Sequence, residues 1–162
     1  MAEMNTARLV LELPGPAGSR AHGGKEAGSV NQAFTLEPLP TEGSDVYRII
    51  NTYNGLALDM TPTGVVTARV VNVNTYQYFR IIKQGDGSEV IRHAYHDLVL
   101  NMTDDGIVSG RRYDGNRDQS FRISHNGANS GISSWYHQVA PPSVPVITSP
   151  AEGAGTGARP TI

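Results

Sequence analysis

The sequence contains no cysteine and only two lysines, Lys25 and Lys83. Without cysteine, disulfides, thiolate nucleophiles and cysteine-ligated zinc are excluded. The net charge of -2 and the scarcity of lysine argue against a basic surface facing phosphates, so we expect no nucleic acid partner. No apolar run approaches the roughly 20 residues that a membrane span needs, so we expect none.

The first residues of the chain, 1–6, lack the basic start and apolar stretch of a signal peptide. Together with the absence of cysteine, this predicts a cytoplasmic protein, with unconventional secretion left open. Only 17% of residues are charged and 38% hydrophobic, whereas 18 Gly and 10 Pro indicate many turns. A chain of 162 residues with this composition fits one domain and a tail.

Two segments of the chain repeat each other at an offset of 42 residues. Residues 56–81 and 98–123 align without a gap, with 12 of 26 positions identical. Both open with Leu-x-Leu-x-Met-Thr and close with Gln-x-Phe-Arg-Ile. A weaker third copy opens at residues 9–13 and closes at residues 32–36. Self-similarity of this kind predicts three copies, at about residues 7–45, 46–88 and 89–123.

Each copy carries the pattern of four short strands. Leu-x-Leu-x-Met alternates with period two, as a half-buried strand does. Residues 62–64 and 104–106 supply tight hairpin turns before a return strand, and Gln-x-Phe-Arg-Ile supplies another strand. A further strand precedes this set at residues 46–50 and 90–92. No segment shows a helical period.

Three four-strand units that cannot bury their own apolar faces predict an all-β fold, a β-trefoil with pseudo-threefold symmetry. Its core would contain the recurring Leu, Ile and Phe positions, including Phe34, Phe79 and Phe121.

The first copy lacks its first strand, because only a few residues precede Leu9. We expect a C-terminal strand at 134–139, after a turn-rich stretch at 124–133, to fill that slot, with Val139 near Arg8. Tyr136 would then match Tyr47. The alternative is an N-terminally truncated chain with an unrelated strand after the third copy.

Residues 1–139 are therefore expected to form the trefoil domain. Residues 140–162 contain half of the prolines together with Gly, Ala and Thr, and we expect a disordered Pro/Gly-rich tail.

Segments 47–51, 54–59 and 77–79 resemble the ricin-B-like (R-type) lectins, whose hallmark is a repeated Gln-x-Trp. Phe replaces Trp in all three copies here. Short copies without cysteine are most similar to fungal members. The resemblance covers roughly residues 7–123 and implies a non-catalytic, carbohydrate-binding β-trefoil whose partners are glycans or glycoproteins.

In ricin-type lectins a sugar site combines an Asp after the Leu-x-x motif, an aromatic platform and an Asn before the Gln. Asp and Asn fix sugar hydroxyls by hydrogen bonds, while the ring packs on the C–H face of the sugar. No copy has the whole set. The departures are Tyr76 in place of Asn beside Asp59, Glu12 in place of Asp beside Asn31, and the exchanged pair Asn101 and Asp118.

The densest polar and aromatic loop is 111–118, followed by 72–76 in the second copy. We therefore predict shallow carbohydrate sites in these loops. The alternative is a solvated loop with local ion pairs of little energy. The three glutamines at 32, 77 and 119 can likewise satisfy backbone groups at a turn. The candidate carbohydrate-binding residues are Asp59, Asn74, Tyr76, Asn101, Tyr113, Asp114 and Asn116.

No motif for catalysis is found: there is no Gly-x-Ser-x-Gly, no phosphate loop and no metal-ligand spacing. His93 and His96 on one strand would lie on opposite faces, and no third ligand is evident. We therefore expect no enzyme activity, no metal and no cofactor.

Two other functions remain open for this fold. The first is a protease inhibitor that acts through an exposed loop, such as 124–133 or 37–44. The second is a trefoil scaffold without a ligand. Weak single sugar sites would benefit from avidity, and a homodimer is one way to supply it.

Overall fold

The computed structural model describes residues 7–127 and 129–139, and within them the chain consists of strands and short 3-10 turns without an α-helix. The expected tail, 140–162, lies outside the described residues. The strands are β1 (Ala7–Glu12), β2 (His22–Lys25), β3 (Phe34–Pro38), β4 (Val46–Asn51), β5 (Leu56–Met60), β6 (Val66–Val70), β7 (Phe79–Lys83), β8 (Glu89–His93), β9 (Val99–Met102), β10 (Val108–Arg111), β11 (Phe121–Asn126) and β12 (Asn129–Val139). The 3-10 turns are η2 (Val30–Gln32), η3 (Thr75–Gln77) and η4 (Arg117–Gln119).

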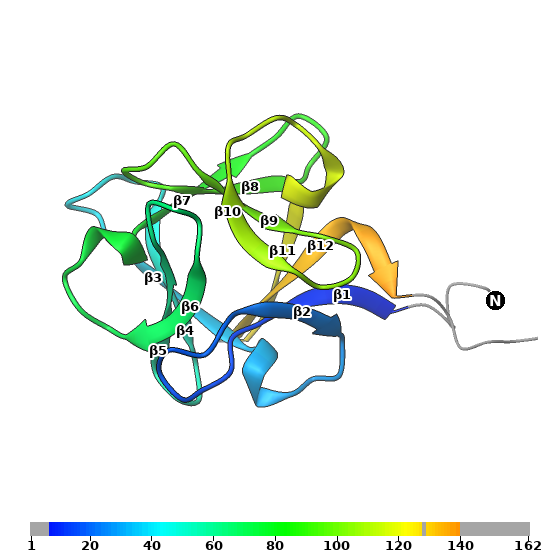
Figure 1. The fold of residues 1–162 in the computed structure, drawn as a ribbon, viewed down its shortest axis with the longest axis horizontal. Coiled ribbons are helices and arrows are strands. Elements are labelled where there is room, and N and C mark those ends of the chain that lie inside the picture. Colours follow the sequence, from blue (N-terminus) through cyan, green and yellow to red (C-terminus); the bar gives the residue numbers. More distant parts are fainter. Residues whose placement is uncertain (1–6, 128, 140–162) are drawn as a thin grey trace, which may run out of the picture. The chain divides into compact units, whose positions relative to one another are not determined.

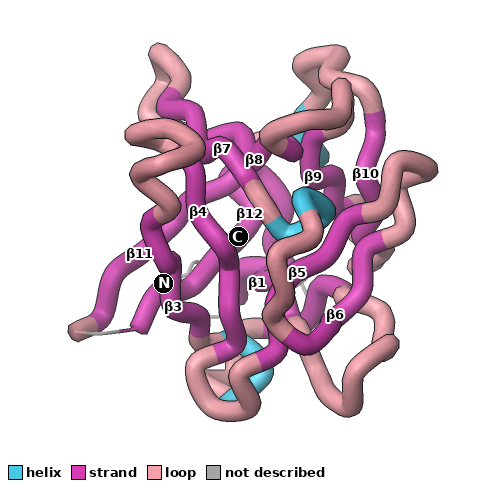
Figure 2. The backbone as a smooth tube through the Cα atoms, turned by 90° about the vertical axis from the view of Figure 1, so that its left-hand side faces the viewer, coloured by secondary structure: helices cyan, strands magenta, loops and turns pink. Residues whose placement is uncertain are grey.

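Six strands close into a barrel through antiparallel pairs, in the ring order β3, β4, β7, β8, β11, β12 and back to β3. The other six form three hairpins, β1–β2, β5–β6 and β9–β10. Figure 1 shows these hairpins arranged around the centre of the domain. In the side view of Figure 2, β5–β6 and β9–β10 lie toward one end and β3 and β11 toward the other. The prediction of an all-β β-trefoil is confirmed.

The closing strand β12 completes the first copy. It pairs with β11, with β3 and with β1, so it stands to β1 as β4 stands to β5 and β8 to β9. Arg8 reinforces this contact, because its Nη1 donates to the backbone carbonyl of Ser134 at 3.1 Å. Figure 1 shows β12 beside β1. The side chain of Val139 lies outside the described residues.

Two details of the predicted C-terminal segment were wrong. β12 begins at Asn129 rather than at Ser134, because small Ser and Gly residues pair with β11 by their backbones and need no apolar alternation. The range 124–133 is therefore mostly strand, in the hairpin of β11 and β12. The register also pairs Phe121 with Ser134 where Phe34 pairs with Asn51, so Tyr136 matches Tyr53 and not Tyr47.

The core lies where the copies meet. Phe34, Phe79 and Phe121 are fully buried, as the repeat predicts, and each pairs with two neighbouring barrel strands. Full burial of such side chains contributes roughly 1.5–3 kcal/mol each. Around them pack residues that recur at equivalent places in the copies, among them Leu11, Leu58, Leu100, Met60 and Met102.

Hairpin turns interlock at the capped end of the barrel. Gly64 and Gly106 adopt φ values of 90° and 89°, a region that favours glycine. A Cβ at Gly64 would stand 2.3 Å from the carbonyl oxygen of Gly110, and one at Gly106 2.5 Å from that of Gly23. The same pairs are joined by backbone hydrogen bonds of 2.8 Å. The glycines therefore let one hairpin turn rest directly on the next hairpin.

Candidate functional site

A buried glutamine holds the loop before each Gln-x-Phe strand. In the second copy, Gln77 donates to the carbonyl of Val70 at 3.0 Å and accepts from the amide of Asn72 at 3.1 Å. The same two contacts recur in the other copies, from Gln32 to Lys25 and Ala27 and from Gln119 to Arg112 and Asp114. The interpretation that these glutamines satisfy backbone groups at a turn is confirmed.

The acid or amide at the end of the Leu-x-Leu strand lies beneath this loop. Asp59 is 6% exposed and accepts from Gln77 Nε2 at 3.3 Å, and Glu12 accepts from Gln32 Nε2 at 2.6 Å. Burial raises the pKa of Asp59, while the Gln77 hydrogen bond and the charge of Arg69 oppose that rise. Asn101 is 2% exposed, and its Oδ1 has no hydrogen-bond partner among the described residues. Asp59 and Glu12 therefore support the loops of their copies from inside, and Asn101 is buried at the equivalent position of the third copy.

Asn74 and Asn116 begin the 3-10 turns of their copies. Asn74 accepts from the amide of Tyr76 at 3.0 Å, and Asn116 accepts from the amide of Asp118 at 2.7 Å. These are the backbone contacts that N-capping residues make. Their side-chain oxygens are thus engaged locally, although both residues are exposed.

Tyr76 packs against a histidine pair. Its ring centroid lies 5.8 Å from that of His96, which in turn stacks on His93 at 4.3 Å. The expectation that the two histidines lie on opposite faces of one strand was wrong, because β8 ends at His93 and the chain then turns back. Burial, and then the neighbouring His96, lower the pKa of His93 to about 4.

The loop of the third copy, residues 111–117, is exposed throughout. Tyr113 is 50% exposed, and its hydroxyl donates to Gln84 Oε1 at 3.2 Å. Asp114 turns the chain beside it by accepting from the amide of Asn116 at 2.9 Å. The structure thus presents Tyr113, Asp114 and Asn116 on one loop, above the buried Asn101.

The other predicted site residues belong to a different copy. Asp59 lies on β5 and Tyr76 on η3, which pack together, and Asn74 is the residue before η3. In the third copy, Asn101 lies on β9 and Asn116 is the residue before η4. The predicted residues therefore form two separate sets, one in each of the last two copies. Of the two, the third copy exposes the ring and the polar groups best.

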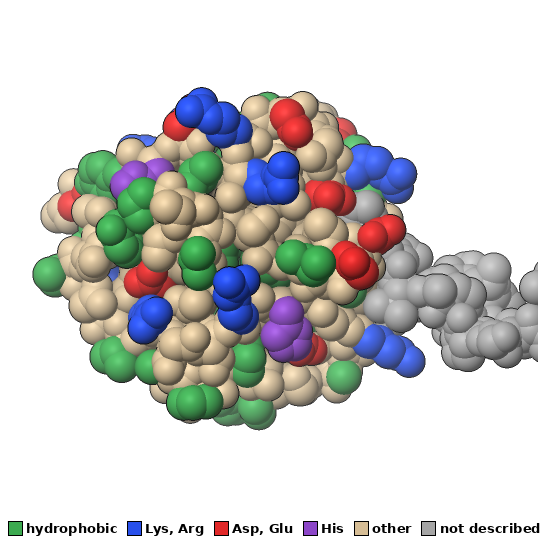
Figure 3. Space-filling model, in the orientation of Figure 1, with side chains coloured by type: hydrophobic (Ala, Val, Ile, Leu, Met, Phe, Trp, Pro, Cys, Tyr) green, Lys and Arg blue, Asp and Glu red, His purple; other side chains and the backbone are tan. Residues whose placement is uncertain are grey.

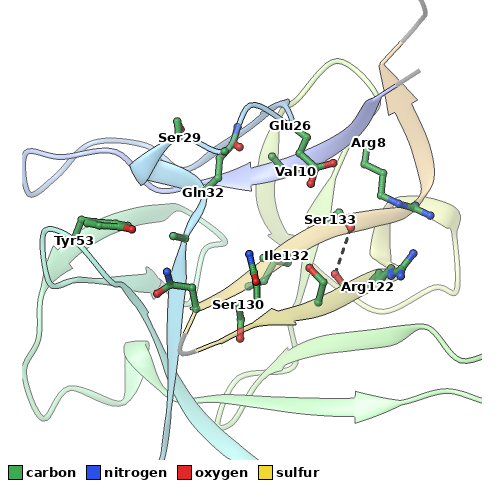
Figure 4. A pocket seen from close by; sticks show the side chains of 16 residues that line it. Arg8, Val10, Glu26, Ser29, Gln32, Tyr53, Arg122, Ser130, Ile132 and Ser133 are labelled. Atoms are coloured by element: carbon green, nitrogen blue, oxygen red, sulfur yellow. Dashed lines mark hydrogen bonds between the residues drawn. The ribbon is translucent and has the colours of Figure 1, made fainter. Parts of the chain in front are cut away.

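A cavity that the sequence did not indicate lies between the first copy and the β11–β12 hairpin. It has a volume of about 530 Å³. We call it the Gly131 pocket. Figure 4 shows side chains from β1, from the loop before β3 and from the β11–β12 hairpin around it. It is lined by Arg8, Val10, Glu26, Gly28, Ser29, Gln32, Ala33, Tyr53, Arg122, Ser124, Asn126, Asn129, Ser130, Gly131, Ile132 and Ser133.

A second cavity, of about 450 Å³, receives residues from all six barrel strands. Leu36, Ile81 and Ile123, which follow the core phenylalanines by two positions, form its apolar part.

The comparisons with known proteins agree with this geometry. A family model described as "Ricin-type beta-trefoil lectin domain-like" matches residues 30–114, more than half of the chain. The chain belongs to this ricin-type β-trefoil lectin-domain-like family. No curated protein is similar enough to the sequence to count as a match.

Several solved structures share the fold at low sequence identity. The designed threefold-symmetric protein ThreeFoil has a TM-score of 0.61 at 19% identity, over 80% of this chain and 98% of that one. The BEL β-trefoil has a TM-score of 0.61 at 16% identity, over 77% and 84%. The Polyporus squamosus lectin, solved with Neu5Acα2-6Galβ1-4GlcNAc bound, has a TM-score of 0.59 at 18% identity, over 79% of this chain and 44% of that one.

The remaining surface features are modest. On the face drawn in Figure 3, basic and acidic side chains are interspersed. Among residues 7–127 and 129–139, no helix is long and apolar enough to cross a membrane. Within the same ranges, no group of three or more His, Asp or Glu side chains is placed to hold a metal ion.

Proposed function

We propose that the protein is a non-catalytic lectin that binds carbohydrate at the loop of the third copy, residues 111–118. The observation that carries this proposal is the half-exposed ring of Tyr113, tethered through its hydroxyl to Gln84 and flanked by Asp114 and Asn116. A tyrosine fixed in this way loses little side-chain entropy when a ligand covers it.

The chemistry of this loop suits a sugar. An aromatic face takes the apolar C–H face of a pyranose, while exposed amide and carboxylate groups take its hydroxyls. Asp59 and Asn101 are buried, so we assign them the support of the loops rather than direct contact. Membership of the ricin-type lectin-like family and the glycan-bound Polyporus lectin support carbohydrate as the ligand class.

A glycan array followed by calorimetry tests the proposal. We expect specific binding to at least one glycan, weakened about tenfold or more by Tyr113→Ala, because one stacked ring contributes about 0.5–1.5 kcal/mol beyond its buried area. Tyr113→Phe should retain most of the affinity, since it keeps the ring.

Tyr95→Ala is the matched control, because Tyr95 is 56% exposed and lies outside the loop. A blank array, or equal loss of binding in Tyr95→Ala and Tyr113→Ala, would contradict the proposal.

A further inference from the structure

The Gly131 pocket exists because the first copy lacks two large side chains that the second copy has. The register that pairs Phe34 with Ser130 and Phe79 with Tyr47 makes Gly131 the counterpart of Arg48. Across the neighbouring strand, Gly131 pairs with Ser124 where Arg48 pairs with Glu37.

In the second copy, Arg48 fills the corresponding space. Its guanidinium bonds to Glu37 at 2.9 Å and to the carbonyl of Asn72 at 3.1 Å, and it lies 5.4 Å from the ring centre of Tyr78. The residue before the core phenylalanine is Tyr78 there but Ala33 in the first copy. A charged side chain in the second copy is thus replaced by an open cavity in the first.

The lining of the Gly131 pocket is rich in hydrogen-bonding groups. Its volume of about 530 Å³ falls within the roughly 300–1,000 Å³ typical of small-molecule sites. Hydroxyls and amides from β11, β12 and the loop before β3 line it, and Tyr53, 62% exposed, adds an aromatic ring. The polar uncharged side chains are Ser29, Gln32, Ser124, Asn126, Asn129, Ser130 and Ser133.

The charged lining residues are Arg8, Arg122 and Glu26, which leaves an excess of one positive charge. Neither guanidinium has an ion-pair partner among the described residues. Figure 4 shows Arg8 and Arg122 at the same end of the pocket and Tyr53 toward the other. Arg8 uses Nη1 to hold Ser134, and a guanidinium has five donors, so both arginines keep donors for a ligand.

We propose that the Gly131 pocket binds a saccharide that carries a carboxylate. The carboxylate lies at the Arg8 and Arg122 end, because guanidinium and carboxylate form charge-assisted and often paired hydrogen bonds. The sugar hydroxyls meet the serine and asparagine groups along β11 and β12, and the sugar ring approaches Tyr53. This site is separate from the Tyr113 loop and does not depend on it.

Calorimetry with small probes tests this site. Methyl glucuronide is the acidic probe, methyl glucoside the neutral probe of the same shape, and acetate the anion alone. We expect methyl glucuronide to bind about tenfold or more tightly than either of the others. Arg122→Gln, at an exposed position of β11, should remove that preference.

A double variant fills the pocket with the residue pair that occupies the equivalent space in the second copy. Ser124→Glu with Gly131→Arg recreates the Glu37–Arg48 pair of the second copy. A Cβ at Gly131 would stand 3.2 Å from Ser124 Oγ, and that side chain is changed as well. We expect an unfolding midpoint close to that of the parent and no glucuronide binding.

Equal binding of glucuronide and glucoside, equal binding of glucuronide and acetate, or undiminished binding by a folded double variant would each overturn the proposal. So would the absence of glucuronide binding to the parent protein. Tyr113→Ala separates the two sites, because it should weaken binding of the glycan taken up by the Tyr113 loop about tenfold or more and leave glucuronide binding in the Gly131 pocket unchanged.

Discussion

At the scale of single residues, three equivalent buried positions carry different side chains that all accept the backbone amide two residues later. Asn51, His93 and Ser134 each pair with a core phenylalanine across the barrel. Asn51 and His93 are the last residues of β4 and β8, whereas Ser134 lies within β12. Asn51 Oδ1 accepts the amides of Tyr53 and Asn54, and His93 Nδ1 accepts the amides of Tyr95 and His96. Ser134 Oγ accepts the amide of Tyr136. The neutral imidazole of His93 therefore accepts the same kind of backbone hydrogen bonds as the side-chain amide of Asn51.

His93 makes stability depend on pH. Its pKa falls from 6.5 to about 4 in the folded chain, and protonation of Nδ1 would also remove two hydrogen bonds. Between pH 6.5 and pH 4 the unfolded chain binds a proton that the folded chain does not, so the free energy of unfolding falls as pH falls. The loss approaches about 3 kcal/mol at pH 4.

His93→Asn should remove this loss, because Asn51 shows that asparagine can cap the same turn. Urea denaturation of parent and variant at several pH values measures the difference. The raised pKa of Asp59 acts in the opposite direction in both proteins and cancels. His125→Asn, at an exposed histidine, is the control. Parallel curves for parent and His93→Asn would contradict the assignment.

The structural role of the three glutamines could be predicted from the sequence. A Gln that recurs two residues before a core Phe is well placed to hydrogen-bond backbone groups at a turn. They did not indicate the His93–His96 stack, since it depends on a strand that ends at His93. The Gly131 pocket could not be predicted from the sequence either. It arises from Gly131 and Ala33, which are small residues far apart in the sequence, and only the barrel register places them together.

At the scale of elements, the hairpin turns depend on contacts between copies. Gly64→Ala should lower the free energy of unfolding by at least about 1–3 kcal/mol, because the backbone has a φ of 90° and the new Cβ meets the carbonyl of Gly110 at 2.3 Å. Chemical denaturation measures this. Gly55→Ala is the matched control, since its φ is also positive, at 76°, and nothing lies within 4 Å of a Cβ there. Equal effects of both changes would contradict the interlocking of the hairpins.

Element boundaries followed from the sequence wherever apolar residues alternate. β4, β5 and β9 were found within a residue or two, because Leu, Ile and Val mark their buried faces. The start of β12 was missed, because Ser130, Gly131 and Ser133 give no apolar pattern and the strand is held by its backbone pairing with β11.

At the scale of the whole molecule, the barrel closes only when β12 takes its place. A chain that ends at Asn126 lacks one of six barrel strands and one of the two partners of β1, so we expect it to lose cooperative unfolding. A chain that ends at Val139 keeps every described strand and should unfold like the parent. Circular dichroism and thermal denaturation distinguish the two. A cooperative transition in the shorter chain would show that β12 is dispensable.

Because β12 is synthesised long after β1, the edge of β1 has no partner during much of translation. During synthesis the β1–β2 hairpin leaves the ribosome early, but its neighbour in the sheet follows more than a hundred residues later. The edge of β1 stays unpaired for that time, and unpaired edges are where strands of other chains attach. Nascent chains on crowded polysomes would therefore be most prone to aggregate in the interval before residue 139 emerges.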